Sequence, residues 1–202
     1  GKVSRTMTEI AKALVTGGAG FIGSHLVKEL IARGYRVTVL DDLSTGSVDN
    51  IHQALDSGRA ELVRGSITDG DLIGQCCRDV RYVFHLAAIS RVPQSIADPV
   101  TTHEVNINGT LKVLLAAREN GVGKFIYASS SSVYGENPEL PQREDMVPQP
   151  VSPYAVSKLV GEHYADVFRQ IYGLPTVSLR FFNAYGSHQD PDSPYSNVIP
   201  LF

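Results

Sequence analysis

Tyr154 and Lys158 are the residues of this sequence whose types and spacing most directly suggest chemistry. They lie four positions apart in Tyr154-Ala-Val-Ser-Lys158, and residues four apart share one face of an α-helix. The ammonium would then lie beside the phenol and favour its phenolate, a usable base. Ser152 is a good N-cap and Pro153 suits the first helical position, so Tyr154 and Lys158 are expected near the start of a helix. Without further context, the same spacing also fits a surface tyrosine packed on a lysine stem.

A second pattern, Thr16-Gly-Gly-Ala-Gly-Phe-Ile-Gly23, is typical of a turn that holds phosphate groups. It joins a short apolar, β-prone run to a segment with helical spacing of its apolar residues, which is the context of a dinucleotide site. Gly17 permits the tight turn, Gly20 lets the backbone approach a pyrophosphate, and Gly23 lets the helix pack on the sheet. The helix start would offer free N–H groups to the phosphates.

An acidic pair follows the second apolar run, in Leu40-Asp41-Asp42. Dinucleotide-binding folds place an acid at about this distance from the glycine turn, where it bonds the adenosine ribose. A carboxylate there would repel a 2′-phosphate, so the sequence favours NAD over NADP. Asp41, taken as the first residue past the strand, is the expected ribose ligand, and one of the two aspartates could instead cap the turn.

The elements that must position these residues alternate along the chain. Apolar runs predict strands at 13–16, 36–40, 60–64, 82–86, 124–128 and 176–180, and helical spacing predicts helices at 21–33, 49–55, 69–77, 101–119 and 153–172. This alternation predicts an α/β fold, a Rossmann-type doubly wound parallel sheet covered on both faces. The proline-rich segment before residue 153 and the polar segment after Asn183 are expected to be loops at the carboxyl end of the sheet, where such folds bind ligands.

Composition narrows the class of protein. The 202 residues are 43% apolar and 19% charged, which suits one globular domain with at most the start of a second. The net charge of −3 and the lack of a basic run argue against a nucleic-acid partner. Cys76 and Cys77 are adjacent and the histidines are scattered, so we expect no disulfide framework and no metal. No apolar run could span a bilayer, and we expect a cytoplasmic protein without membrane contact.

Six segments, in this order, resemble the extended short-chain dehydrogenase/reductase family, also described as NAD-dependent epimerases and dehydratases. They are Thr16 to Gly23, His85-Leu-Ala-Ala88, Asn106-Ile-Asn-Gly-Thr110, Ser129-Ser-Ser-Ser-Val-Tyr-Gly135, Tyr154 with Lys158, and Arg180-Phe-Phe-Asn183. Within the family, the chain most resembles nucleotide-sugar 4-epimerases of the UDP-glucose/UDP-galactose and UDP-N-acetylglucosamine type. The resemblance implies bound NAD, a UDP-sugar substrate, and inversion at C4 through a 4-keto intermediate.

The resemblance also assigns roles to single residues. Ser130, Tyr154 and Lys158 match the catalytic positions, and Asn106 matches a helix residue that supports them, although a satisfied buried amide is the alternative. The substrate would contact Ser90, Arg91, Ser130 and Asn183. Contacts to NAD are expected from Gly17, Gly20, Phe21, Ile22, Gly23, Asp41, Ser66, Ile67, Leu86, Ala87, Ala88, Tyr154 and Lys158.

Three departures from the family pattern bear on specificity. Ser66 stands where relatives usually have an aspartate that contacts adenine, and its hydroxyl can still accept a hydrogen bond. The serine run 129–132 lacks the Asp-Glu pair of sugar 4,6-dehydratases, which disfavours water elimination. Arg91 could pair with a uronate carboxylate, which keeps UDP-glucuronate-type epimerases in consideration, and a surface loop arginine is an equally good interpretation.

Family members extend beyond the point that matches residue 202, into a carboxyl-terminal lobe that closes over the sugar. We therefore expect residues 10–182 to form an NAD-binding Rossmann domain and 183–202 to be the start of a truncated substrate lobe. Residues 1–9 are expected to be a disordered tail or cloning remnant.

Two further functions stay open: a nucleotide-sugar dehydrogenase or reductase that releases NADH, and a non-catalytic NAD-binding sensor or scaffold. Relatives commonly form homodimers through a helix pair, which here would be 101–119 with 153–172.

Overall fold

The computed structural model describes residues 10–189, and within them the chain forms one parallel six-stranded sheet in the order β3-β2-β1-β4-β5-β6. This is the doubly wound order, so the predicted fold class is confirmed. The strands are β1 Lys12–Thr16, β2 Arg36–Asp41, β3 Ala60–Arg64, β4 Val80–His85, β5 Lys124–Ser130 and β6 Thr176–Phe181. The predicted tail at 1–9 and the last thirteen residues of the predicted lobe, 190–202, lie outside the described residues.

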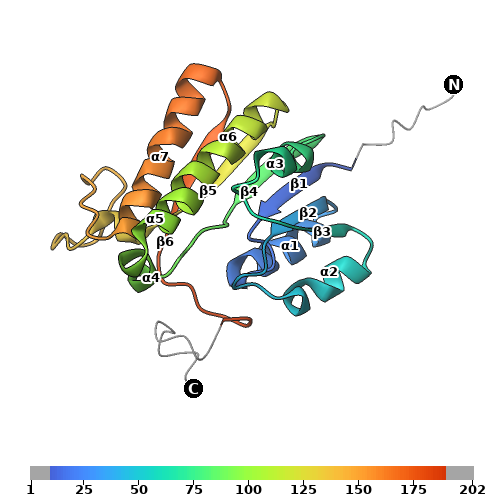
Figure 1. Ribbon diagram of the computed structural model, residues 1–202, viewed down its shortest axis with the longest axis horizontal. Helices are drawn as coiled ribbons and strands as arrows, with labels where there is room; N and C mark the ends of the chain where they lie inside the picture. The colour runs from blue at the N-terminus through green and yellow to red at the C-terminus, as the bar shows by residue number, and fades with distance from the viewer. Residues whose placement is uncertain (1–9, 190–202) are drawn as a thin grey trace, which may run out of the picture.

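Helices cover both faces of the sheet (Figure 1). On one face, α3, α6 and α7 lie side by side, and α1 and α2 cover the other. The helices are α1 Phe21–Ala32, α2 His52–Asp56, α3 Gly70–Cys76, α4 Val92–Ala97, α5 Pro99–His103, α6 Thr110–Glu119 and α7 Pro153–Tyr172, with 3-10 turns η1 Val48–Ile51 and η3 Ser131–Tyr134 and a π-helical segment η2 Glu104–Gly109. None of these helices is long and apolar enough to cross a membrane.

Strand β1 shows how the apolar pattern builds two cores. Successive side chains of a strand point to opposite faces. Leu14 therefore packs with Phe125 in the core under α3, α6 and α7, whereas Ala13 and Val15 pack with Val27 in the core under α1. All five of these side chains are fully buried. A central strand that is apolar on both faces is what a doubly covered parallel sheet requires.

The region between β4 and β5 differs from the single predicted helix at 101–119. It contains α4, α5, η2 and α6 in succession. No element was predicted at residues 92–97, because six residues that begin Val-Pro give too short a pattern to reveal a helical period. The π-helical segment carries Asn106, whose carbonyl accepts a hydrogen bond from Thr110 Oγ1 at 2.6 Å.

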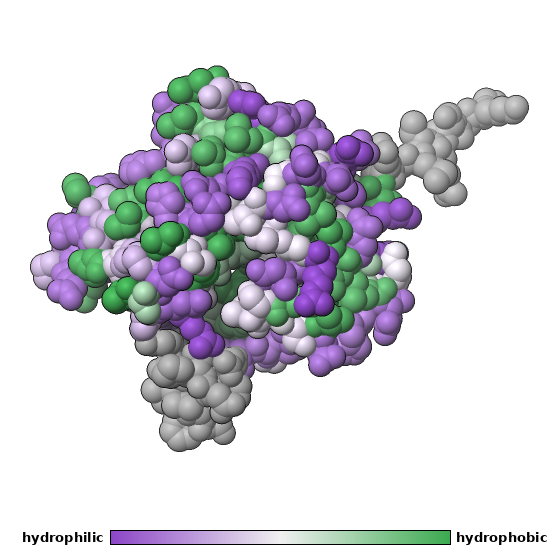
Figure 2. Space-filling model, in the orientation of Figure 1, coloured by the Kyte–Doolittle hydropathy of each residue, from purple (hydrophilic) through white to green (hydrophobic). Residues whose placement is uncertain are grey.

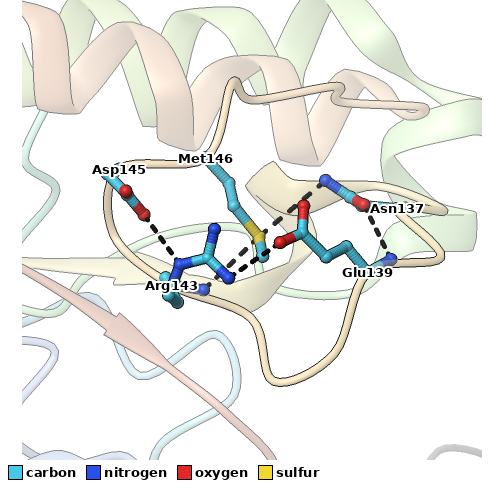
Figure 3. A network of polar contacts seen from close by, with 5 residues as sticks. All are labelled: Asn137, Glu139, Arg143, Asp145 and Met146. Atoms are coloured by element: carbon cyan, nitrogen blue, oxygen red, sulfur yellow. Dashed lines mark hydrogen bonds and ion pairs between the residues drawn. The ribbon is translucent and has the colours of Figure 1, made fainter.

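The segment between η3 and α7 is the predicted proline-rich loop, and side-chain contacts hold it together (Figure 3). Arg143 donates to Glu139 Oε1 at 2.8 Å and to Asp145 Oδ1 at 3.2 Å, and its backbone N–H points at Met146 Sδ at 3.4 Å. Met146 is buried against Val133 and Leu159. Because Val133 lies in η3 and Leu159 in α7, the methionine ties the loop to both neighbouring elements.

Close packing of α7 on β5 gives a first prediction. A Cβ added at Gly161 would lie 2.2 Å from the Tyr127 hydroxyl, whereas a Cβ at Gly74 in α3 meets nothing within 4 Å. Gly161→Ala should lower the free energy of unfolding by about 1 to 2 kcal/mol, because overpacking outweighs the gain in helix propensity. Gly74→Ala, the matched control, should raise it by about 0.5 to 1 kcal/mol. Urea unfolding measures both, and equal effects of the two changes would contradict the packing argument.

Candidate active site

The carboxyl ends of β1, β4 and β5 meet at one edge of the sheet, and a cavity of about 640 Å³ opens there. In the space-filling view, the molecule is hollowed between the part that carries α4 to α6 and the part that carries α1 (Figure 2). Every predicted site residue except Arg91 lines this cavity. The fold therefore brings together residues that are up to 166 positions apart, from Gly17 to Asn183.

The glycine turn forms one end of the cavity. Gly17 has φ +69°, and a Cβ there would lie 2.8 Å from the backbone nitrogen of Ala87. A Cβ at Gly23 would lie 2.1 Å from the Gly17 carbonyl oxygen. Both positions need glycine, the first for its backbone conformation and the second for close packing. Gly20 is the N-cap of α1 and provides no side-chain cap, so the first N–H groups of this helix are left for a ligand such as a pyrophosphate.

Asp41 lines the cavity and also braces the glycine turn. Its Oδ2 accepts a hydrogen bond from Ala19 N, and its Oδ1 accepts one from Leu43 N, each at 2.9 Å. Asp41 was predicted to be the first residue past the second strand, but it is the last residue of β2. Its pairing with Arg64 extends the ladder by one residue. Asp42 Oδ1 caps the following turn by accepting from Ser44 N.

Ser66 lies at the rim next to β3, where the adenine was expected. Its hydroxyl is within 2.9 Å of Thr68 Oγ1 and accepts from Thr68 N at 3.2 Å. Lys112 of α6 donates to the Thr68 carbonyl at 2.7 Å and so holds this short loop against the helix. Asp69 caps α3, because its Oδ1 accepts a hydrogen bond from Leu72 N at 3.0 Å.

Tyr154 and Lys158 lie in the first two turns of α7, which begins as predicted. Ser152 caps the helix by accepting from Ala155 N at 3.1 Å. Lys158 is only 4% exposed, and its Nζ donates to the Ala128 carbonyl at 2.8 Å. The same nitrogen lies 5.8 Å from the centroid of the Tyr154 ring. Both side chains reach the cavity from one helix face, as the spacing requires.

The pKa shifts of Tyr154 and Lys158 do not favour the expected phenolate. Burial raises the pKa of Tyr154, and a hydrogen bond with Ser130 opposes that rise. Burial also lowers the pKa of Lys158 to about 8. Desolvation thus disfavours both charged forms. Because burial raises the pKa of Tyr154, the neutral phenol is the favoured form at neutral pH.

The serine run at the end of β5 divides its contacts. The Ser129 hydroxyl donates to Glu162 of α7, away from the phenol. Ser130 interacts with Tyr154 and also accepts hydrogen bonds from the backbone N–H and the hydroxyl of Ser132, at 3.1 and 2.8 Å. The geometry therefore singles out Ser130 among the four serines, in agreement with the position that the resemblance indicated.

The remaining predicted residues separate into two groups. Ser90 and Asn183 line the cavity, as do Leu86 to Ala88, whereas Arg91 is the N-cap residue of α4 and does not line it. Sequence reasoning missed several lining residues, most of which adjoin predicted ones. Gln94 lies on the unpredicted α4, and Thr101 and Val105 lie within the predicted helix 101–119. The missed residues are Leu40, Asp42, Ser44, Thr45, Gly65, Ile89, Gln94, Thr101, Val105, Ala128, Ser129, Phe181, Phe182, Ala184 and Gln189.

Comparisons with known proteins agree with this geometry. Residues 13–202 match the family described as the NAD dependent epimerase/dehydratase family. The chain belongs to this family. A relative named UDP-glucose 4-epimerase, from Mycolicibacterium smegmatis, is 43% identical over 193 residues, which cover 95% of this chain and 61% of the relative.

Two solved structures of family members superpose closely. A UDP-N-acetylglucosamine 4-epimerase from Methanobrevibacter ruminantium, in complex with UDP-N-acetylmuramic acid, gives a TM-score of 0.90 at 42% identity and matches 95% of this chain and 61% of its own. A UDP-glucose 4-epimerase from Thermus thermophilus, in complex with NAD, gives 0.82 at 44% identity, with 89% and 58% matched. The chain thus spans about three fifths of the length of these relatives.

In this family member, a buried polar chain connects the glycine turn to α7. Leu86 N and Ala87 N each donate to Thr16 Oγ1 at 3.2 Å, and Thr16 Oγ1 lies 2.7 Å from His85 Nδ1. His85 Nε2 lies 2.9 Å from Thr110 Oγ1, which donates to the Asn106 carbonyl. Since Thr110 uses its proton there, Nε2 is assigned as the donor and Nδ1 as the acceptor. His85 is therefore a neutral histidine with both nitrogens satisfied.

The polar chain continues through Asn106 to α7. Asn106 Nδ2 donates to Ile89 O and to Ser157 Oγ at 3.0 Å each, and its Oδ1 accepts from Ile89 N at 2.8 Å. Ser157 in turn donates to the Tyr154 carbonyl at 2.7 Å. Asn106 is thus a satisfied buried amide that also links the β4 loop to the turn of α7 that carries Tyr154.

His85 gives a prediction for acid stability. Burial, with a smaller contribution from the charge of Lys158, lowers the pKa of His85 to about 3. The unfolded chain binds a proton at this residue below about pH 6.5 while the folded chain does not, so stability is lost as the pH falls from 6.5 towards 3. His85→Gln, which keeps one donor and one acceptor, should reduce this loss by up to about 1.4 kcal/mol per pH unit.

The measurement is urea unfolding at several pH values between 4 and 7. The exposed His163 of α7 offers a matched control, since His163→Gln should leave the pH dependence unchanged. An unchanged pH dependence in His85→Gln would show that the buried histidine is not the group responsible.

Proposed function

We propose that this chain is the cofactor-binding part of an NAD-dependent epimerase that inverts C4 of a UDP-hexose, such as UDP-glucose or its N-acetyl form, through a 4-keto intermediate. The observation that carries the proposal is that Ser130, Tyr154 and Lys158 converge on the cavity that the glycine turn and Asp41 also line. Proton-transfer residues and a dinucleotide cradle thus share one enclosed space. Relatives named UDP-glucose 4-epimerase share more than two fifths of their residues with the chain over the matched region.

The residues at the edge of the sheet fit NAD. The uncapped start of α1 suits the pyrophosphate, and the free lone pairs of the Asp41 carboxylate suit ribose hydroxyls. The same carboxylate disfavours a 2′-phosphate, which supports NAD over NADP. Ala87 and Ala88 are small enough to leave room between the turn and α7, and Ser66 offers a hydroxyl near the adenine. When bound, oxidised NAD supplies a hydride acceptor and a positive charge.

The side chains of this chain then manage the proton. Tyr154 takes the proton of the sugar 4-hydroxyl, and Ser130 orients that hydroxyl through a hydrogen bond. For Tyr154 to act at pH 7, its pKa must fall by about 3 units from the reference value of about 10, which corresponds to about 4 kcal/mol of stabilisation of the phenolate. Lys158 contributes its charge, and it can leave the Ala128 carbonyl to bond the nicotinamide ribose. Inversion would require that C4 lose a hydride to the bound cofactor, that the resulting 4-keto sugar turn over, and that the hydride be returned to its other face.

The lining residues favour a neutral hexose over the two alternative sugar chemistries. Arg91, the residue that suggested a uronate, does not line the cavity, whereas Ser90 and Gln94 do. A dehydratase needs an acid beside the catalytic hydroxyl, and Ser132 occupies that neighbourhood with its own hydroxyl donated to Ser130. A UDP-glucuronate-type epimerase and a nucleotide-sugar dehydrogenase or reductase are therefore less well supported, and an intact Ser130, Tyr154 and Lys158 argues against a sensor or scaffold.

The domain division follows from this proposal. Residues 10–182 would form the NAD-binding Rossmann domain, and residues from 183 onward would begin the lobe that contacts the sugar. Asn183 and Phe182 line the cavity at this boundary. A homodimer through the α5–α6 region and α7 stays a prediction.

The deciding experiment uses a full-length protein that contains this chain. It is incubated with UDP-glucose, UDP-N-acetylglucosamine or UDP-glucuronate without added reductant, and the products are followed by NMR. A 4-epimer from either neutral sugar without net NADH supports the proposal. Net NADH identifies a dehydrogenase, and epimerisation of the glucuronate alone identifies the uronate enzyme. No product from any of the three, with NAD retained, favours the sensor.

A single substitution tests the role of the phenol. Tyr154→Phe should lower turnover at least a thousandfold, because the proton acceptor is lost, while bound NAD is retained. Tyr164→Phe removes a half-buried phenol from the same helix and should leave turnover within twofold. Epimer formation and nucleotide content after gel filtration are the measurements. Equal loss of NAD and turnover in Tyr154→Phe would mean that the residue is structural.

A further inference from the structure

Three residues of α7, each four positions after the last, contact three successive residues at the end of β5. Tyr154 interacts with Ser130, Lys158 Nζ donates to the Ala128 carbonyl, and Glu162 accepts from the Ser129 hydroxyl. Spacing of four residues keeps these side chains on one helix face. The first two contacts belong to the proposed proton-transfer centre, whereas nothing in that mechanism uses the third.

Arg180 of β6 holds the Glu162 carboxylate with both ends of its guanidinium. Nε donates to Oε1 at 2.9 Å and Nη2 donates to Oε2 at 2.8 Å, so the pair is bidentate. The two side chains are only 16% and 13% exposed. The guanidinium carbon also lies 4.7 Å from the centroid of the Tyr134 ring, just after the serine run. Arg180 is thus fixed from two sides.

A carboxylate four residues after a lysine on a helix is ordinarily close enough to pair with it. Here Glu162 instead directs both oxygens to Arg180 and Ser129, and Lys158 turns to a neutral carbonyl. Burial lowers the pKa of Lys158, which is opposite to the effect of a paired carboxylate. The ammonium therefore keeps its charge available for the phenol and for a ligand.

We propose that Arg180 and Glu162 are positioning residues of the active site: Arg180 occupies Glu162, which fixes the end of β5 through Ser129 and prevents Glu162 from neutralising Lys158. The inference rests on the proposed function for its meaning in catalysis. The alternative is that the pair only fastens β6 to α7. A largely buried ion pair is by itself weak support for a gain in stability, so the two roles must be separated by experiment.

The titration of Lys158 separates them, because it needs no substrate. The titratable groups around Lys158 are Tyr154 and Glu162 on α7, Tyr127 on β5 and His85 on β4, with Arg180 on β6 behind Glu162. The midpoint of Lys158 is expected near pH 8, within reach of a folded protein. With ¹³C-labelled lysine, NMR resolves the six lysines of the chain, and Lys158→Met assigns the resonance.

The sign and size of the shift in each variant are the test. Arg180→Gln frees the carboxylate and should raise the Lys158 midpoint by about one pH unit, whereas Glu162→Gln leaves the guanidinium unpaired and should lower it. The double variant removes both charges and should return the midpoint to the wild-type value. A fastening role predicts only small shifts of similar size and opposite sign from the two lost charges, whereas release of Glu162 onto Lys158 makes the rise in Arg180→Gln the larger of the two. Shifts of the same sign or of similar size in both single variants, or no shift in either, would overturn the proposal.

Controls keep the test independent of folding and of the proposed function. Arg169→Gln removes an exposed arginine that pairs with Asp166 on the same helix and should leave the midpoint unchanged. If Arg180→Gln does not fold, Glu162→Gln and the double variant still carry different expectations, a lowered midpoint and the wild-type midpoint. All proteins are compared at equal bound-nucleotide content. A wild-type protein without epimerase activity would contradict the proposed function and leave this titration intact.

Activity provides the second readout in a full-length active protein. Arg180→Gln should lower kcat at pH 7 by about tenfold, with little change in KM, because a Lys158 neutralised by Glu162 no longer favours the Tyr154 phenolate, and each unit of rise in the pKa of Tyr154 lowers the phenolate population tenfold. The double variant should recover most of that loss. A double variant as impaired as Arg180→Gln would show that the pair acts only through the fold.

Discussion

The hydrogen bond from the buried Lys158 ammonium to the Ala128 carbonyl is the contact on which the site depends. A buried charge needs partners, and this one has a carbonyl oxygen together with the faces of Tyr127 and Tyr154. The pairing of β5 with β4 ends at Tyr127, one residue before Ala128, whereas the pairing with β6 continues to Ser130. The contact of Lys158 with Ala128 sets the first turns of α7 against the last residues of β5. The position of Tyr154 relative to Ser130 follows from this single docking contact and from the cap at Ser152.

A second constraint fixes the cofactor end relative to the catalytic end. The buried chain from Thr16 through His85 and Thr110 to Asn106 has one consistent arrangement of donors and acceptors. Because each hydroxyl donates in one direction only, a charged His85 would break the chain at one end. Neutrality of that histidine therefore matters more for alignment than for chemistry. The glycine turn and the start of α7 are joined through side chains and not only through the sheet.

Much of the fold and site was predictable because its determinants are local. The glycine turn, the cap at Ser152 and the spacing of Tyr154 and Lys158 each act within a few residues. Contacts between distant segments were not readable: the bracing of Ala19 by Asp41 and the capture of Glu162 by Arg180 depend on the assembled sheet. The short helix α4 was missed because its six residues carry too little periodicity. Arg91 was assigned to the sugar from its position in the family pattern, and the structure instead makes it the N-cap residue of α4.

Burial and charge at the site explain why the spacing of Tyr154 and Lys158 does not by itself give their ionisation states. Burial raises the pKa of Tyr154 and lowers that of Lys158, so the same enclosure that excludes water opposes the ionised pair. A phenolate becomes favourable only when further positive charge enters the cavity, and the oxidised nicotinamide carries such a charge. If Glu162 were free to pair with Lys158, part of that effect would be cancelled. In the proposed mechanism, ionisation of Tyr154 would therefore be coupled to occupancy of the glycine turn, and proton transfer would depend on the presence of the hydride acceptor.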